Sequence, residues 1–125
     1  MNKFDLEERL IEFSVLIIEI STEILKTKAG NHLSGQLVRS GTSPALNYGE
    51  AQSAESRKDF IHKMKVILKK LRETFVCLKI IDKAKLYKNI GKMQKTLKEC
   101  NELISIFVKS VETDQKNLNK SNCYE

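Results

Sequence analysis

The chain has 125 residues, which is enough for one domain with one sizeable hydrophobic core. Its single Pro and five Gly supply too few turn residues for a fold of many short strands, so a few long helices are expected. The net charge of +6 is uneven: residues 1–62 carry seven Lys/Arg and nine Asp/Glu (−2), and residues 63–125 carry fifteen and seven (+8). Such a basic half either solvates helix surfaces or binds an anionic partner, most commonly nucleic acid.

A first helix is predicted over residues 5–27, where Asp5 with Glu8 has the spacing of a capping box. Apolar residues recur at steps of three and four along one face, at Leu6, Leu10, Phe13, Ile17, Ile20 and Ile24. A second apolar line contains Ile11, Val15 and Ile18. One neighbouring face needs only one such line, so this helix is either central to the bundle or also buried against another subunit. We take the second line as a candidate oligomer interface.

A second helix is predicted from about residue 31 to 53, after a turn at residues 28–30. Ser, Gly, Ala and Thr crowd this segment, and such a composition makes a poor isolated helix. It suits a segment against which other helices pack closely, because small side chains let backbones approach. Pro44 interrupts the segment, so either the helix kinks near residues 41–43 or a new helix begins at Pro44. We favour one kinked helix.

A third helix is predicted to begin at Ser56, with Asp59 as its capping-box partner, and to end near residues 82–84. A fourth is predicted over about residues 89–112 from the same apolar periodicity. Four helices with short connections predict an all-α, antiparallel up-down-up-down four-helix bundle over residues 1–112. Residues 113–125 are polar and are predicted to form a frayed tail.

No constellation of residues indicates catalysis or metal binding. The two histidines, His32 and His62, lack the Glu-x-x-His spacing of di-metal bundles, and neither belongs to a nucleophile motif. Phosphate-loop motifs are absent. We therefore expect no enzyme activity, no cofactor and no metal. Arg39, Asn47 and Glu50 are interpreted as a hydrogen-bond and salt-bridge network that fixes the second helix to its neighbours or to another subunit, with a ligand site as the alternative.

The cysteines at 77, 100 and 123 have no CxxC spacing, and we expect Cys77 and Cys100 to be small core residues in a reducing cytoplasm. The N-terminal residues lack a basic segment followed by an apolar block. The longest apolar run, Val15–Ile18, is far shorter than a membrane span. A soluble, cytoplasmic protein with no membrane partner is expected.

Residues 63–98 hold twelve Lys/Arg against Glu73 and Asp82. Because the third and fourth helices meet in a hairpin, we expect these charges to converge at one end and side of the bundle. Phosphate binding there would be salt-sensitive and mostly independent of nucleotide sequence. The alternative use is attraction to the acidic edge of the first helix on an adjacent subunit. The candidate nucleic-acid-binding residues are Lys65, Lys69, Arg72, Lys79, Lys83, Lys88, Lys92 and Lys95.

The central third of the chain carries a specific pattern, QLVRSGTSPALNYGEAQSAESRKDFIHKMKVILKKLRET over residues 36–74. This pattern closely resembles the signature of the bacterial four-helix-bundle family of 23S rRNA-intervening-sequence proteins, also called S23 ribosomal proteins. The positions taken as family signature and structural residues are Arg39, Ser40, Gly41, Pro44, Asn47, Glu50 and Asp59.

The resemblance implies a cytoplasmic homo-oligomer, in the form of a pentameric ring of bundles. It also implies kinship with the accessory variability determinant of diversity-generating retroelements, whose basic rings contact nucleic acid and a reverse transcriptase. Our leading hypothesis is a non-enzymatic homo-oligomeric bundle that binds RNA or DNA through its basic surface. The alternative is a protein-interaction scaffold ring whose lysine-rich face meets an acidic protein partner.

Overall fold

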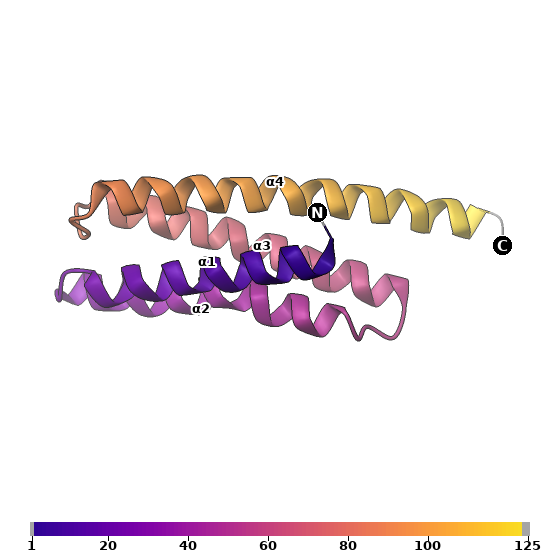
Figure 1. Cartoon of the computed structure of the whole chain (residues 1–125), viewed down its shortest axis with the longest axis horizontal. Coiled ribbons are helices and arrows are strands. Elements are labelled where there is room, and N and C mark those ends of the chain that lie inside the picture. Colours follow the sequence, from indigo (N-terminus) through magenta and orange to yellow (C-terminus); the bar gives the residue numbers. More distant parts are fainter. Residues whose placement is uncertain (1, 124–125) are drawn as a thin grey trace.

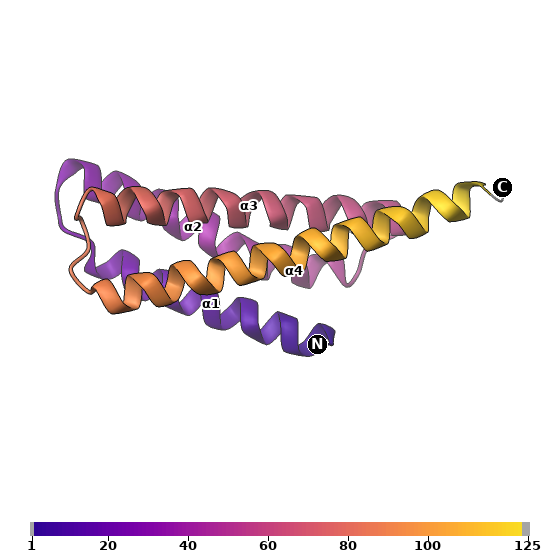
Figure 2. The same ribbon diagram turned by 90° about the horizontal axis from the view of Figure 1, so that it is seen from above.

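The computed structural model describes residues 2–123, which form four helices: α1 (Lys3–Glu23), α2 (Lys28–Ala51), α3 (Arg57–Lys83) and α4 (Ile90–Cys123). α1 packs against α2 and α4, and α3 packs against the same two helices, so α1 and α3 lie diagonally across the bundle. The α1–α2 and α3–α4 connections lie at one end, and the α2–α3 connection lies at the other (Figures 1 and 2). The predicted all-α, up-down-up-down bundle is confirmed.

The hydrophobic core follows the apolar periodicity of the sequence. All six residues of the first apolar line of α1 are buried. They meet fully buried residues of the other helices, including Leu37, Leu71 and Phe107. The ring of Tyr48 meets that of Phe107 edge-on, with 5.9 Å between ring centroids. Over the described residues, no helix is both long and apolar enough to cross a membrane.

Both central cysteines belong to this core, as predicted. The thiol of Cys100 donates to the carbonyl of Leu71 at 3.3 Å, and that of Cys77 donates to the carbonyl of Leu33 at 3.8 Å. Burial raises the pKa of Cys77, and it raises the pKa of Cys100 to about 12. Both thiols are therefore protonated at neutral pH and are poor nucleophiles.

The small-residue segment forms most of α2 and permits a close contact with α1. A Cβ atom added to Gly41 would lie 2.6 Å from Cγ2 of Ile17, so only the absence of a side chain allows α1 to approach. Ser40 and Pro44 are buried beside it. The helix is continuous through Pro44, and its axis changes direction in its middle (Figure 1). The predictions of close packing and of one kinked helix are confirmed.

Two helix starts differ from the predictions because other residues cap them. α1 begins at Lys3, since the side-chain oxygen of Asn2 accepts hydrogen bonds from the backbone of Phe4 and Asp5, each at 3.0 Å. The predicted cap at Asp5 was wrong. Likewise, the hydroxyl of Thr27 accepts from Gly30 N–H at 2.9 Å and caps α2. Residues 28–30 are therefore the first turn of α2 and not a separate turn.

The fourth helix is longer than predicted. It continues to Cys123, so the predicted end at Glu112 was wrong, and the described part of the expected frayed tail is helical. Residues 113–123 contain no Gly or Pro that would stop a helix. The C-terminal part of α4 extends beyond the other three helices (Figures 1 and 2). Residues 124 and 125 of the predicted tail lie outside the described residues.

We predict that Gly41→Ala destabilises the bundle by about 1–3 kcal/mol, because the added methyl group overpacks the contact with Ile17. Gly35→Ala is the matched control on the same helix, since a Cβ at Gly35 has no atom within 4 Å. That control should stabilise by about 0.5–1 kcal/mol through helix propensity. Denaturant unfolding measures both, and equal stabilisation by the two variants would contradict the proposed close approach.

Lys85 has a left-handed backbone, with φ of 59°, directly after α3. The Leu86 N–H donates to the carbonyl of Ile81 at 3.1 Å, which closes the helix end in the manner of a Schellman motif. Glycine is the favoured residue at such a position because a Cβ atom disfavours this conformation.

We therefore predict that Lys85→Gly raises the free energy of unfolding by about 0.5–1 kcal/mol. The measurement is thermal or denaturant unfolding. The control variant, measured in parallel, is Lys83→Gly, which removes an equal charge from the last residue of α3. Lys83→Gly should destabilise, since helix residues lose stability on replacement by glycine. A destabilised Lys85→Gly protein would refute this account of the helix end.

Candidate interaction surfaces

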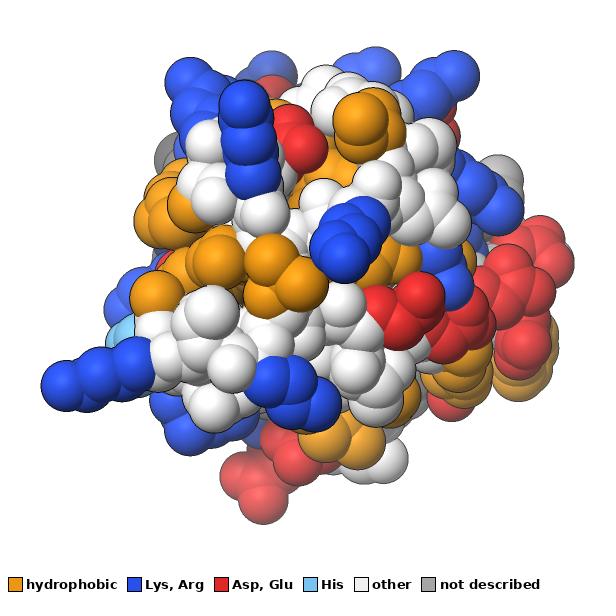
Figure 3. Space-filling model, turned by 90° about the vertical axis from the view of Figure 1, so that its left-hand side faces the viewer, with side chains coloured by type: hydrophobic (Ala, Val, Ile, Leu, Met, Phe, Trp, Pro, Cys, Tyr) orange, Lys and Arg blue, Asp and Glu red, His pale blue; other side chains and the backbone are white. Residues whose placement is uncertain are grey.

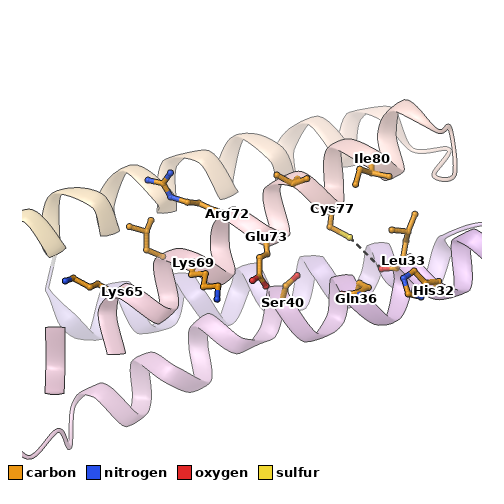
Figure 4. A pocket seen from close by; sticks show the side chains of 12 residues that line it. His32, Leu33, Gln36, Ser40, Lys65, Lys69, Arg72, Glu73, Cys77 and Ile80 are labelled. Atoms are coloured by element: carbon orange, nitrogen blue, oxygen red, sulfur yellow. Dashed lines mark hydrogen bonds between the residues drawn. The ribbon is translucent and has the colours of Figure 1, made fainter. Parts of the chain in front are cut away.

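A groove runs between α2 and α3 on one face of the bundle, with a volume of about 740 Å³ (Figure 4). We call it the basic groove. From α2 it is lined by His32, Leu33, Gln36 and Ser40, and from α3 by Lys65, Leu68, Lys69, Arg72, Glu73, Val76, Cys77 and Ile80. Figure 4 shows Cys77 of α3 directed towards Leu33 of α2, where the two helices meet.

The basic groove has a charged part and an apolar part, in this order along α3. Lys65, Lys69 and Arg72 are exposed, and none of them forms a salt bridge within the described residues. The only acidic residue of the lining, Glu73, accepts from Lys70 at 3.4 Å. One turn further along, Val76 and Ile80 are 55% and 47% exposed. The groove therefore suits an elongated ligand that is acidic at one end and apolar at the other.

The opposite face, formed by α1 and α4, presents the second apolar line of α1. Ile11, Val15 and Ile18 are 42%, 49% and 46% exposed, so this line is not buried inside the bundle. The exposed carboxylates of Glu8, Glu12 and Glu19 flank it. We call this surface the acidic ridge, defined by Glu8, Ile11, Glu12, Val15, Ile18 and Glu19.

Ion pairs connect α1 to α4 beside the acidic ridge. The guanidinium of Arg9 donates to both carboxylate oxygens of Glu99, at 2.8 and 2.7 Å, and to Glu102 at 2.7 Å. The hydrogen bond to Glu99 raises the pKa of Arg9. Lys92 donates to Glu19, which raises the pKa of Lys92, and it lies 3.7 Å from Glu23. Lys92 is therefore already neutralised within the chain.

A third group of charges lies at the end of the bundle that carries two connections. The Leu25 N–H donates to the carbonyl of Leu86 at 2.9 Å and joins the α1–α2 connection to the α3–α4 connection. Figure 3 views this end, where Lys and Arg side chains are spread around the rim and most acidic ones gather on the right. We call its five exposed lysines the basic end: Lys26, Lys28, Lys83, Lys85 and Lys88.

The structure divides the eight predicted basic residues among separate places. Lys65, Lys69 and Arg72 line the basic groove, and Lys83 and Lys88 belong to the basic end. Between them on α3, the ammonium of Lys79 lies 5.3 Å from the ring centroid of Phe75.

Lys92 and Lys95 instead lie on the α1/α4 face. The predicted convergence on one end and side was therefore wrong, because packing turns the lysines of α4 towards the acidic side chains of α1. Lys26, Lys28 and Lys85 were not selected from the sequence. Their position near Lys83 and Lys88 could have been predicted from the antiparallel topology, because that topology places the α1–α2 and α3–α4 connections at the same end of the bundle.

Some of the family-signature residues are buried in the bundle, and others lie near its surface. Ser40, Gly41 and Pro44 are buried on the packed side of α2. Asn47 donates to the carbonyl and the hydroxyl of Ser43, at 3.0 and 2.7 Å, and so stays within its own helix.

The other polar signature residues lie near the surface. Arg39 and Glu50 are exposed, and among the described residues their one link to another helix is the ion pair of Glu50 with Lys63, at 4.0 Å. The predicted network through Arg39, Asn47 and Glu50 is therefore not formed between the described helices of one chain, and contacts of these residues with another subunit stay a prediction. The predicted cap of α3 is confirmed, because the Asp59 N–H donates to the hydroxyl of Ser56 at 3.0 Å.

Within residues 2–123, no cluster of three or more His, Cys, Asp or Glu side chains is arranged to hold a metal ion. What these residues do present is charged surface, in the basic groove and at the basic end.

Comparison with known proteins places this geometry in a family. Residues 2–109 match the family described as 23S rRNA-intervening sequence protein. Among solved structures, the chain is similar to a protein of unknown function from the S23 ribosomal protein family of Bacteroides thetaiotaomicron. The two share 25% sequence identity with a TM-score of 0.80, over 90% of this chain and 99% of that chain. No curated protein matches the chain. Because the family match spans most of its length, the chain belongs to the family of 23S rRNA-intervening sequence proteins.

Proposed function

We propose that this protein is a non-enzymatic, homo-oligomeric bundle of the cytoplasm that binds RNA or DNA through the basic end. One observation carries the proposal: the two connections are joined by the hydrogen bond between Leu25 and Leu86, so that lysines from both gather at one end. None of these five lysines forms a salt bridge within the described residues. Their charges are therefore available to an external anion.

The chemistry of the basic end suits phosphate groups more than bases. Ammonium groups on flexible stems act as point charges that neutralise phosphates and release counterions. The only aromatic residue of the α3–α4 connection, Tyr87, is buried and offers no stacking platform. Binding would therefore be salt-sensitive and would depend little on nucleotide sequence.

The backbone at Lys85 supports this reading of the lysines. A lysine occupies a left-handed position where glycine would be more stable. A locally unfavourable residue that adds charge to an exposed cluster is expected where the charge serves binding. Lys79 lies next along α3 and would extend the same surface.

Oligomerisation would strengthen such binding. In a ring whose axis is parallel to the bundle, all basic ends lie on one face of the ring. Several weak phosphate contacts then act together on one nucleic-acid strand or duplex. The pentamer that the resemblance implies would present five basic ends.

A second candidate is a scaffold ring that meets an acidic protein partner. The exposed apolar residues Val76 and Ile80, beside unpaired cations, favour it because protein interfaces combine both features. A reverse transcriptase is the partner that kinship with retroelement accessory proteins would supply.

We predict that Lys83→Gln/Lys85→Gln/Lys88→Gln lowers nucleic-acid affinity at least about 10-fold at low salt and reduces the slope of log affinity against log salt by about 2–3. The measurement is fluorescence anisotropy with labelled single-stranded and duplex RNA and DNA at several salt concentrations. The matched control, Lys109→Gln/Lys116→Gln/Lys120→Gln, removes three exposed lysines from the C-terminal part of α4.

The control should change affinity much less than the basic-end variant. Equal losses in both variants would show that only net charge matters. No binding by the wild type at low salt, with an intact oligomer, would reject nucleic-acid binding and favour the scaffold.

A further inference from the structure

We propose that the acidic ridge of one copy docks into the basic groove of the next copy. The inference rests on the homo-oligomer part of the proposed function, and it names the two faces that meet. In this contact, carboxylates of the neighbouring copy pair with the cations of the basic groove. The basic end stays available for nucleic acid.

The two surfaces are complementary in charge and in apolar character. Glu8 and Glu12 of the ridge form no salt bridge within the described residues. The same is true of Lys69 and Arg72, which line the basic groove. Eight large apolar side chains are exposed on the described residues, and five of them lie on these two surfaces: Ile11, Val15, Ile18, Val76 and Ile80. Docking would cover all five, and exposed apolar patches beside charge mark interaction sites.

The order of groups along the helices fits one orientation. On α1 the free carboxylates of Glu8 and Glu12 come before Val15 and Ile18. On α3 the cations Lys65, Lys69 and Arg72 come before Val76 and Ile80. A parallel arrangement of α1 and α3 therefore brings carboxylates to cations and apolar side chains to apolar side chains. In this bundle α1 and α3 already point the same way, so a copy rotated about an axis parallel to the bundle presents α1 in that orientation.

The two surfaces also occupy the same part of the bundle's length. Ile17 contacts Gly41, whose neighbour Ser40 lines the basic groove. At the other end of the ridge, Arg9 pairs with Glu99, and the adjacent Cys100 bonds to Leu71, next to Arg72.

At about 1.5 Å per helical residue, the ridge from Glu8 to Glu19 is about 16 Å long and the groove from Lys65 to Ile80 is about 22 Å long. The ridge therefore fits the groove after rotation, with little shift along the axis.

The contact is head-to-tail, since the ridge and the groove lie on opposite faces of one copy. A head-to-tail contact closes into a ring when the rotation divides a full turn, and otherwise it extends into a filament. A rotation with little translation favours the closed ring. Each copy then uses one ridge and one groove, and no second kind of interface is needed.

Charge reversal on each face, followed by its combination, tests the docking. Lys69→Glu/Arg72→Glu makes the groove acidic, and Glu8→Lys/Glu12→Lys makes the ridge basic. Each variant alone places like charges in contact and should weaken assembly about 100-fold or more. The quadruple variant restores opposite charges with reversed sign and should regain the wild-type mass.

The readout is solution mass by sedimentation and light scattering, without nucleic acid, at several concentrations of the 14.3 kDa chain. Lys116→Glu/Lys120→Glu, on the overhanging end of α4, is the control that reverses two charges elsewhere and should keep the wild-type mass. Circular dichroism checks that every variant retains its helices, which is expected because all the changed residues are exposed.

An oligomer that persists in either single-face variant would overturn the docking while leaving the proposed function intact. A quadruple variant that stays monomeric, when both single-face variants are folded monomers, would also overturn it. A monomeric wild type would reject the homo-oligomer itself. Nucleic-acid binding is measured separately through the basic end, so loss of that proposal leaves the mass result unaffected.

Discussion

The close approach of α1 and α2 at Gly41 is the constraint on which the surface of this bundle depends. With no side chain at this position, Ile17 can enter the space that a Cβ atom would occupy. This contact goes with a rotation of α1 that buries its core line, in which Phe13 and Ile17 are fully buried. A helix can turn only one side inwards, and the neighbouring line of Ile11, Val15 and Ile18 is left at the surface. The packing of the core therefore determines the apolar surface outside it.

The same rotation decides which charges cancel and which stay free. It sets Glu19 and Glu23 beside Lys92, and Arg9 beside Glu99, so the α1/α4 face is held by ion pairs. No comparable set of acidic residues meets the cations of the basic groove on the opposite face. The cations of the basic groove and of the basic end therefore stay without salt bridges within the described residues.

The core of this protein was predictable from the sequence, but the distribution of its charges was not. Core positions follow from spacing alone, because residues at steps of three and four share one helix face. The cap at Ser56 and the continuity of α2 through Pro44 were predicted for the same local reasons. The partner of each lysine depends instead on how each helix is rotated in the bundle, which a single helix does not encode. Two basic residues illustrate this dependence on helix rotation: Lys92 is paired with Glu19 of α1, whereas Arg39 is exposed.

The two proposed contacts, nucleic acid at the basic end and the ridge in the groove, differ in their physical basis. Added salt should therefore weaken the first more than the second. Phosphate contacts at the basic end would be made by lysine ammonium groups, so added salt weakens them through counterion competition. The ridge and groove combine charges with Val15, Ile18, Val76 and Ile80. Burial of apolar surface does not depend on charge screening, and strongly hydrated salts even strengthen it. Rising salt should therefore release nucleic acid while the oligomer persists, because the two contacts lie on different surfaces of the same bundle.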